Sequence, residues 1–349
     1  MSAADRGGST GQKVFKMSDI ARLAGVSEST VSRALSDSPL INNKTKARIR
    51  DIAAAHNYTI NERARNFRLQ RTQTIATLIA LDPETGQHIS DPFFLDMLGA
   101  IADALTEHGY DLLLSQVPSS DLSWERKYLN ANRADGIIFI GQSSLHDEFN
   151  RLARRGAPMV VWGAKLADQT YCSVGGDNLT GGLKAVRHLL NLGRRRIVFL
   201  GQKALPEVSL RYQGYRRALG EAGLSAEPEL EAPTYFVRDA ASRAVHQLID
   251  AGVRFDAIFA TGDLIAMSAI QALNERGLSV PDAVSVVGYD DIPLASQYNP
   301  ALTTIRQNIA QGGRALVQAL LDQLDDKRPP PVMLPTELVV RQSCGAGPA

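Results

Sequence analysis

The chain has 349 residues, 44% of them hydrophobic and 21% charged, which is enough for two or three globular domains, and it contains no apolar run of about 18 residues that would span a membrane. Its two cysteines, Cys172 and Cys344, are too few for a disulfide framework or a cysteine-based metal site. The net charge of +1 is unevenly distributed, because residues 1–73 carry 13 Lys and Arg against 6 Asp and Glu, which predicts a polyanionic partner for this basic segment and not for the acidic remainder.

The first 60 residues predict a flexible leader followed by a small all-α domain. Residues 1–16 are polar and have no apolar core of a signal peptide, which favours a cytoplasmic location. In residues 17–60, which we call the head, apolar residues recur at helical spacing on both sides of Gly25, and glycine readily adopts the left-handed conformation of a tight turn. Ser27 can cap the helix that follows, so the head predicts a helix-turn-helix.

The second helix of this pair is expected to read DNA bases. Its outward side chains are Glu28, Ser29, Ser32 and Arg33. The fork of Arg33 matches the O6 and N7 atoms of guanine in the major groove. A third helix over about 44–56 would complete the head, and the side chains expected at DNA phosphates are Ser27, Thr30, Lys44 and Lys46. The alternative is an ordinary helical hairpin on which Arg33 is solvated.

Residues 61–73 predict a short basic helix and a linker. Asn61 can cap the helix, which carries Arg63, Arg65 and one large apolar side chain, Phe67. A helix so short and so charged is unstable by itself in water. For Phe67, packing on the rest of the protein is the alternative to a role in binding.

From residue 74 to about 345, in the segment we call the body, short apolar runs alternate with longer amphipathic stretches. The first of the apolar runs is 75–80 and the last is 284–288. The first of the amphipathic stretches is 93–108 and the last is 263–276. This alternation predicts α/β structure, with parallel sheets covered by helices on both faces. The strands are too many for one small sheet, so we expect two lobes divided near Tyr171, with a ligand cleft at the carboxyl ends of their strands.

Several motifs resemble the LacI–GalR family of bacterial repressors. They are Val26-Ser27-x-x-Thr30-Val31-Ser32-Arg33 in the head and, in the body, Asp91-Pro92-Phe93-Phe94, Ser285-Val286-Val287-Gly288-Tyr289-Asp290-Asp291 and Leu302-Thr303-Thr304-Ile305-Arg306-Gln307. The resemblance runs from about Lys16 to Ser343. It implies a DNA-binding head on a two-lobed, periplasmic-binding-protein-like body. Lobe 1 would comprise about 74–171 and 303–332, and lobe 2 about 172–302 and 333–345.

The resemblance also assigns residues 61–73 to the hinge helix of the family, which orders on operator DNA. Arg63, Arg65 and Phe67 would then lie in the minor groove, with Phe67 at the position of a leucine that wedges into the centre of the site. Phenylalanine replaces that leucine and Ile60 replaces a common proline, so the DNA bend is expected to differ. A homodimer that presents two heads to a roughly palindromic operator is implied. No long apolar heptad tail follows Arg341, so a coiled-coil tetramer is not expected.

A ligand site in the cleft is implied as well. Arg211 matches an arginine that grips the ligand, and Asp263 matches an aspartate that accepts hydrogen bonds from it, a combination suited to sugar hydroxyls. The implied aromatic walls are Phe93, Phe94 and Phe236, and the weaker carboxylate candidates are Asp91, Asp177 and Asp290. The alternatives are a helix cap or turn for each aspartate and core packing for each phenylalanine. The segment 201–209 departs from well-known members and is expected to help choose the ligand.

These features predict a ligand-responsive transcriptional regulator, a repressor of carbohydrate uptake or catabolism genes that a sugar releases from its operator. A purine or nucleoside ligand, and co-repression in place of induction, are the alternatives. A periplasmic-type sugar-binding protein is disfavoured by the basic head and the polar N-terminus. An enzyme is disfavoured because no phosphate-binding glycine loop, nucleophile elbow or His-Glu-x-x-His motif occurs. We therefore expect operator DNA, a small molecule and a second copy as partners, with no cofactor, metal or membrane.

Overall fold

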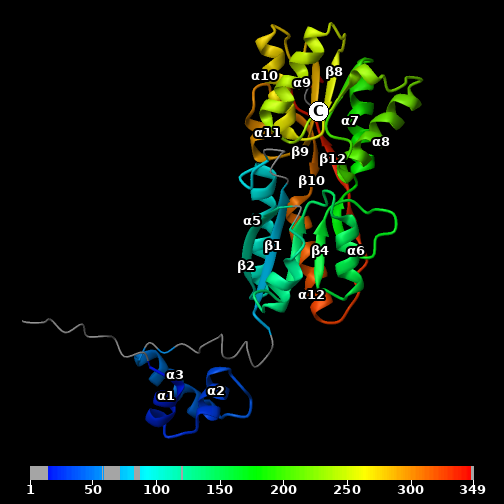
Figure 1. Cartoon of the computed structure of the whole chain (residues 1–349). Helices are drawn as coiled ribbons and strands as arrows, with labels where there is room; N and C mark the ends of the chain where they lie inside the picture. Colours follow the sequence, from blue (N-terminus) through cyan, green and yellow to red (C-terminus); the bar gives the residue numbers. More distant parts are fainter. Residues whose placement is uncertain (1–14, 57, 59–70, 82–86, 119–120, 347–349) are drawn as a thin grey trace, which may run out of the picture. The chain divides into compact units, whose positions relative to one another are not determined.

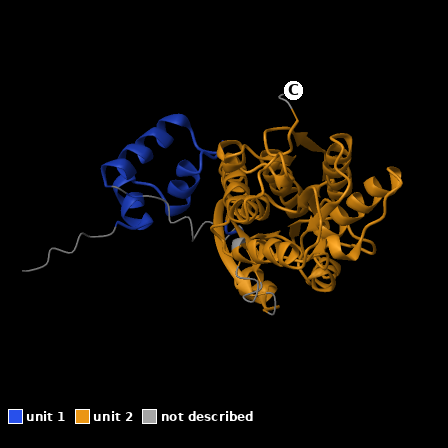
Figure 2. Cartoon of the chain, turned by 90° about the horizontal axis from the view of Figure 1, so that it is seen from above, with its two compact units in different colours: residues 1–72 blue, residues 73–349 orange. Residues whose placement is uncertain are grey.

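The computed structural model describes residues 15–56, 58, 71–81, 87–118 and 121–346. The chain divides into two compact units, residues 1–72 and 73–349, and each packs around its own core (Figure 2). The predicted hinge residues Arg63, Arg65 and Phe67 lie outside the described residues, as does the predicted leader up to residue 14. Among the described residues, no helix is both long and apolar enough to cross a membrane.

Three helices form the head: α1 (Met17–Ala24), α2 (Glu28–Leu35) and α3 (Asn43–Ala55). Gly25 has a φ of 63°, the left-handed conformation that its turn requires. Ser27 caps α2 by accepting a backbone N–H of the first helical turn at 3.2 Å. Ile20, Val31 and Ile49, one from each helix, are fully buried and form the centre of the core. The predicted helix-turn-helix is confirmed.

Lobe 1 of the body is built on a six-stranded parallel sheet with the order β11-β5-β4-β3-β1-β2 (Figure 1). Its strands are β1 (Thr74–Leu81), β2 (Asp111–Pro118), β3 (Gly136–Ile140), β4 (Met159–Trp162), β5 (Cys172–Gly176) and β11 (Val332–Leu334). Its helices are α5 (Pro92–Glu107), the π-helical segment η2 (Glu125–Asn130), α6 (His146–Arg154) and α12 (Ile309–Leu324). In β1, Ile75 and Ile79 pack with α5 and α12, whereas Ala76 and Leu78 pack on the side of α6, so both faces are buried.

Lobe 2 has a second six-stranded sheet with the order β12-β10-β9-β8-β6-β7, in which only β12 is antiparallel to its neighbour. Its strands are β6 (Ile197–Leu200), β7 (Glu231–Ala232), β8 (Ala257–Ala260), β9 (Ser285–Asp290), β10 (Thr303–Gln307) and β12 (Thr336–Val339). Its helices are α7 (Asn178–Asn191), α8 (Pro206–Glu221), the short η3 (Pro228–Leu230), α9 (Arg238–Asp250), α10 (Asp263–Glu275) and α11 (Pro293–Gln297). Helices α9 and α10 cover one face and α7 and α8 the other. The predicted two-lobed α/β body is confirmed.

The chain crosses between the lobes three times, after β5, after β10 and after β11. The expected lobe boundaries are therefore wrong by one strand each. Strand β5, expected to begin lobe 2, pairs with β4 in lobe 1, and β10, expected in lobe 1, pairs with β9 in lobe 2. The reason is that each crossing follows the carboxyl end of a strand instead of preceding the strand, so Gly176 and Gln307 lie at the junction of the lobes.

Candidate ligand cleft and DNA-reading surface

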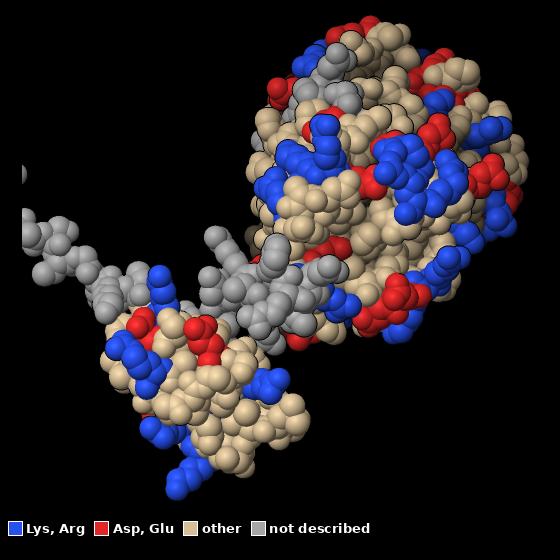
Figure 3. All heavy atoms as spheres, turned by 60° about the horizontal axis from the view of Figure 1, so that its bottom comes forward, with Lys and Arg blue, Asp and Glu red and all other residues tan. Residues whose placement is uncertain are grey.

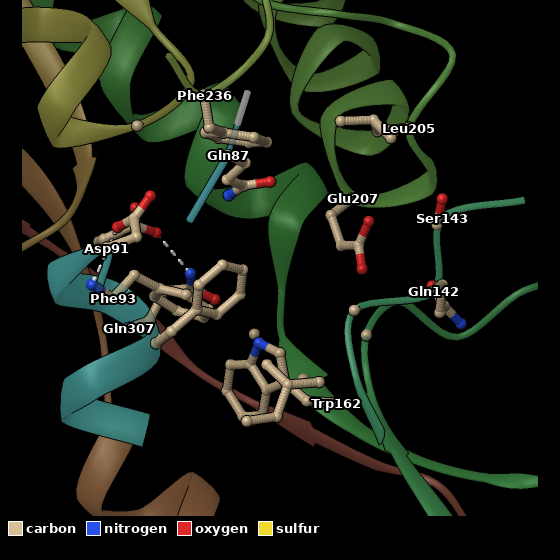
Figure 4. A pocket seen from close by; sticks show the side chains of 18 of the residues that line it. Gln87, Asp91, Phe93, Gln142, Ser143, Trp162, Leu205, Glu207, Phe236 and Gln307 are labelled. Atoms are coloured by element: carbon tan, nitrogen blue, oxygen red, sulfur yellow. Dashed lines mark hydrogen bonds between the residues drawn. The ribbon is translucent and has the colours of Figure 1, made fainter. Parts of the chain in front are cut away.

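A cleft lies between the two lobes of the body, where the strands of both sheets end (Figure 4). Lobe 1 contributes the carboxyl ends of β1, β3, β4 and β5 and the start of α5. Lobe 2 contributes the first turns of α8 and α10 and the ends of β9 and β10. The cleft therefore occupies the position expected from the strand–helix alternation. Seven predicted ligand-site residues line it, namely Asp91, Phe93, Phe94, Arg211, Phe236, Asp263 and Asp290. The weaker candidate Asp177 does not, because it caps α7 by accepting the backbone N–H of Thr180 at 3.0 Å.

Arg211 is buried and held rigidly at the cleft wall. Its Nε donates to Asn178 Oδ1 at 2.8 Å, and its Nη1 donates to the carbonyl oxygen of Thr261 at 2.5 Å. The guanidinium plane lies over the ring of Tyr289, with its central carbon 3.6 Å from the ring centroid. Because these contacts engage two of the guanidinium nitrogens and one face of the plane, Arg211 is held in one orientation at the cleft wall.

The close approach of α7 and α8 sets the position of Arg211. A side-chain carbon at Gly182 of α7 would lie 2.2 Å from the carbonyl oxygen of Arg211, and one at Gly214 of α8 would lie 2.2 Å from the carbonyl oxygen of Leu179. Both neighbours are backbone atoms, so the two helices touch at distances that only glycine permits. Arg211 is therefore carried by a pair of helices that are already packed as closely as their backbones allow.

Asp263, at the first position of α10, lines the cleft and also braces lobe 2. Its Oδ1 accepts the hydroxyl of Thr304 at 2.5 Å, and its Oδ2 accepts the backbone N–H of Ile292 at 2.9 Å. Burial and the neighbouring Asp290 carboxylate raise the pKa of Asp263 well above its ordinary value. The sequence predicted that this residue contacts the ligand, with a helix cap or turn as the alternative. In the structure its hydrogen bonds connect α10 to β10 and to the loop after β9.

Asp91 and Asp290 face the cleft from opposite lobes. Asp91 caps α5 by accepting the N–H of Phe93 at 3.2 Å, so its predicted alternative as a helix cap is what the structure shows, together with its place in the cleft lining. Asp290 accepts from Gln307 Nε2 at 2.7 Å and has a φ of 114°, a strained backbone conformation for a residue other than glycine. Burial raises the pKa of Asp91, and burial raises the pKa of Asp290 to about 7 despite the nearby Arg211.

The raised pKa of Asp290 predicts a pH-dependent stability. The folded chain holds a proton that the unfolded chain releases above its ordinary pKa near 4, so the free energy of unfolding should fall as pH rises from about 4 to 7. Asp290→Asn should remove this part of the slope and raise stability at pH 7 to 8, by on the order of 1–2 kcal/mol after allowance for its partial exposure. Thermal denaturation of the full chain between pH 5 and 8 measures both effects, and equal slopes for variant and wild type would contradict the assignment.

Three aromatic side chains enclose the open part of the cleft. Figure 4 shows Phe236 at one side and Trp162 at the other, with Phe93 beside them. The rings of Phe93 and Trp162 are tilted, with centroids 6.4 Å apart. Phe93 packs against the cores of both lobes, whereas Phe94 is buried in the core of lobe 1. Phe93 and Phe236 therefore fit the predicted wall, and for Phe94 the core-packing alternative describes most of its surface.

Sequence reasoning missed several residues that line the cleft: Gln87, Gln142, Ser143, Trp162, Asn178, Tyr235 and Gln307. Most of them follow the carboxyl end of a strand, which is a signal that could have found them. The segment 201–209, expected to help choose the ligand, supplies Leu205 and Glu207 to the lining. The Glu207 carboxylate points into the open space (Figure 4) and lies near the backbone of Gln142 in lobe 1.

On the head, the predicted base-reading side chains of α2 are available to a partner. Glu28, Ser29 and Arg33 are exposed and Ser32 is half-buried, while the intervening Val31 is in the core. Lys and Arg side chains protrude from the head, and both signs of charge appear on the visible faces of the head and of the body (Figure 3). The helix thus presents one polar edge, as a recognition helix requires.

The predicted phosphate set is only partly supported by the head. Lys44 is exposed, and Ser27 and Thr30 lie at the start of α2. Lys46 is buried, because its Nζ donates to the carbonyl oxygen of Asp37 at 3.1 Å and pairs with the Asp37 carboxylate at 3.0 Å. The structure gives Lys46 a scaffold role in place of the predicted phosphate contact, since its ammonium group stabilises the loop between α2 and α3.

Comparison with known proteins relates both units to characterised sequences. Residues 16–61 match the family model of bacterial regulatory proteins, lacI family, and residues 186–344 match the periplasmic binding protein-like domain. The HTH-type transcriptional regulator CelR of Thermobifida fusca is 31% identical over 335 residues, which cover 93% of this chain and 96% of CelR.

Two solved structures extend the comparison to the whole fold. The complex of the transcriptional regulator CelR with cellobiose superposes with a TM-score of 0.70 at 28% identity, covering 94% of this chain and 99% of that one. The lac repressor dimer bound to operator and the anti-inducer ONPF superposes with a TM-score of 0.82 at 26% identity, covering 96% and 100%. Head and body are thus related to the same group of proteins over nearly their full length.

Proposed function

Because this chain belongs to the lacI family of bacterial regulatory proteins, we propose that it is a repressor of carbohydrate uptake or catabolism genes that a sugar releases from its operator. Members of the family are ligand-responsive, DNA-binding transcriptional regulators. The observation that carries the sugar assignment is the cleft itself, where the fixed fork of Arg211 and several carboxylates adjoin aromatic faces. Carboxylates accept hydrogen bonds from sugar hydroxyls, and a guanidinium donates hydrogen bonds to them. Aromatic rings pack on the C–H face of a pyranose.

The relatives support this ligand class. CelR, which shares 31% identity with this chain, has been solved with cellobiose bound. A related lacI-family regulator of Enterococcus faecium, with a TM-score of 0.68 at 27% identity, has been solved with ribose bound. We propose that Arg211, Asp91, Asp290, Phe93 and Phe236 contact the sugar, while Asp263 holds the lobe 2 wall in place.

On the DNA side, we propose that two chains pair and present two heads to a roughly palindromic operator. The dimeric lac repressor on its operator supports this arrangement. The segment 61–73, with Arg63, Arg65 and Phe67, would enter the minor groove between the heads. Sugar in the cleft would favour one orientation of the lobes and so change the affinity of the dimer for DNA, which is a coupling between two binding equilibria.

The proposal is tested by a thermal-shift screen of the full chain with sugars and nucleosides, followed by operator binding with and without each stabilising compound. A sugar that binds the folded state raises the melting temperature by mass action and should lower the affinity for operator DNA. Stabilisation by nucleosides alone would contradict the carbohydrate assignment. A chain that ignores duplex DNA at low ionic strength, with and without ligand, would contradict the regulator itself.

Arg33→Ala should cost about 1–3 kcal/mol of operator binding and relax base choice at one position of each half-site, because the bidentate contact to a base would be lost. Lys44→Ala serves as the control, since loss of a phosphate contact should weaken all sequences alike and reduce the salt dependence. Binding of both variants to a set of singly substituted operators, defined first by in vitro selection, measures the difference. Unchanged selectivity in Arg33→Ala would exclude this arginine from base reading.

A further inference from the structure

We propose that the cleft accepts an uncharged sugar and excludes sugar phosphates and sugar acids, and that Glu207 of α8 is the residue chiefly responsible. This inference rests on the proposed function, because it concerns the ligand of the same cleft. It narrows the ligand class by charge, a property that the aromatic walls do not determine.

The charges in the cleft are the first argument. Among the described lining residues, four are carboxylic acids, Asp91, Glu207, Asp263 and Asp290, and the one cation is Arg211. A phosphate or carboxylate brought into this space would meet one cation and four acids, each of which repels it wherever that acid is ionised, in surroundings of low dielectric where the repulsion is strong.

The engagement of the cation is the second argument. Arg211 already donates to Asn178 and to the carbonyl oxygen of Thr261, and its face lies on Tyr289. A bidentate grip on an anion needs two donors along one free edge, together with a surplus of positive charge. Here the guanidinium is balanced by its carboxylate neighbours Glu207 and Asp290, which lie close enough to interact with it electrostatically.

Glu207 differs from the other acids in what holds it. Asp263 accepts hydrogen bonds from Thr304 and Ile292. Asp290 accepts one from Gln307, and Asp91 accepts one from a backbone N–H at the start of α5. The carboxylate of Glu207, in contrast, points into the open space near the backbone of Gln142 of the opposite lobe, so its oxygens can accept hydrogen bonds from a ligand there (Figure 4). Burial raises the pKa of Glu207, so an anionic ligand would drive it further toward protonation, a cost that a neutral hydroxyl does not carry.

The position of Glu207 suits a ligand held between the lobes. Glu207 belongs to lobe 2 and lies near Gln142 of lobe 1, and Gln142 is itself fixed, because its side chain donates to the carbonyl oxygen of Ala164 at 2.6 Å and accepts the Ala164 N–H at 2.8 Å. The free acceptor positions of Glu207 then receive hydroxyl protons of a sugar that sits between the lobes.

The test uses the full chain and matched pairs of compounds: glucose with glucose 6-phosphate, glucose with gluconate, cellobiose with cellobionate, and adenosine with AMP. Thermal shift and the fluorescence of Trp162, whose ring lines the cleft, report binding. We expect at least one neutral sugar to stabilise the wild type and every charged partner to leave it unchanged. Glu207→Gln removes the charge and keeps the shape of the side chain. It should lower the affinity for the neutral sugar at least tenfold and reduce the protein's preference for the neutral sugar over its charged partner.

Two further variants separate charge from structure. Glu207→Asp keeps the charge and shortens the reach, so it should lose affinity for the neutral sugar and still reject the anion. Glu221→Gln makes the same chemical change at the far end of α8, where Glu221 is exposed and paired with Arg187, and it should bind like the wild type. A purely structural effect of position 207 would lower affinity without changing the preference between neutral and charged partners.

The proposal is overturned if a charged compound stabilises the wild type as well as its neutral partner, if no neutral compound stabilises it, or if Glu207→Gln keeps both affinity and preference. Failure of the proposed function looks different. Stabilisation by adenosine and not by AMP or by any sugar would contradict the carbohydrate assignment and leave the charge rule standing. Loss of DNA binding would likewise have no bearing on the charge preference of the cleft.

Discussion

Arg211→Lys is expected to make operator binding insensitive to sugar. Lysine keeps the charge but cannot donate along two edges or stack its plane on Tyr289, so the group presented to the ligand would lose its orientation. The partners that Arg211 satisfies, Asn178 Oδ1 and the carbonyl oxygen of Thr261, would also lose their donors. We expect sugar affinity to fall by about 10²-fold or more and the body to lose roughly 2–4 kcal/mol of stability, from the lost hydrogen bonds to a charged group.

The control for this prediction lies on the same helix. Arg217 of α8 is exposed and pairs with Glu221 at 3.2 Å, so Arg217→Lys should change neither sugar affinity nor stability appreciably. Calorimetric titration with the sugar and anisotropy of a labelled operator, each for both variants, give the comparison. Release of the Arg211→Lys protein from operator at ordinary sugar concentrations would remove Arg211 from the ligand site.

The head shows how much of a fold local chemistry can reveal. Gly25 and Ser27 stand at the two positions of a helix-turn-helix where only a few residue types are tolerated, and apolar periodicity places the core on either side. The role of Lys46 was not visible in the same way. Its partner Asp37 lies nine positions earlier in a loop, and nothing in local spacing distinguishes a lysine that meets this carboxylate from one that meets a phosphate.

In the body, periodicity predicted the buried strands and their helices but not the junction of the lobes. Strand β5 reads Cys172-Ser-Val-Gly-Gly176, a short run whose two glycines weaken any strand pattern, and the lobe boundary was consequently placed before it. The glycines are needed because a side-chain carbon at Gly175 would lie 2.1 Å from the carbonyl oxygen of Gly163. Tertiary packing, not local preference, determines this strand.

The cleft residues that were predicted, such as Arg211, came from the family resemblance, and the lining residues that the resemblance did not supply were missed. Gln142 follows β3 and Trp162 ends β4 in lobe 1, whereas Gln307 ends β10 in lobe 2, and they meet because the carboxyl ends of strands from both sheets face the same cleft. The hydrogen bonds of Asp263 depend on Thr304 and Ile292, about 30 to 40 positions away along the chain. Such roles follow from the assembled sheet, so a list of polar residues cannot supply them.

Gly182→Ala is expected to destabilise the body strongly and to displace Arg211. The new methyl group would lie 2.2 Å from the carbonyl oxygen of Arg211, and because the obstacle is backbone it cannot turn aside as a side chain could. Overpacking of a core commonly costs about 1–3 kcal/mol, and we expect this variant to reach or exceed the upper end, since α7 and α8 must separate. Sugar affinity should fall as well, because the separation moves the arginine that lines the cleft.

Gly220→Ala is the matched control, because Gly220 lies in α8 but has no neighbouring atom within 4 Å of the added carbon. Alanine favours a helix over glycine by up to about 1 kcal/mol, so this variant should melt at or above the wild-type temperature and bind sugar normally. Thermal and urea denaturation of both variants, with sugar titration of whatever folds, separates helix propensity from contact. If the two alanine variants melted alike, the close approach of α7 and α8 could not be what positions Arg211. A soluble Gly220→Ala protein beside an insoluble Gly182→Ala protein would be the expected extreme of the same effect.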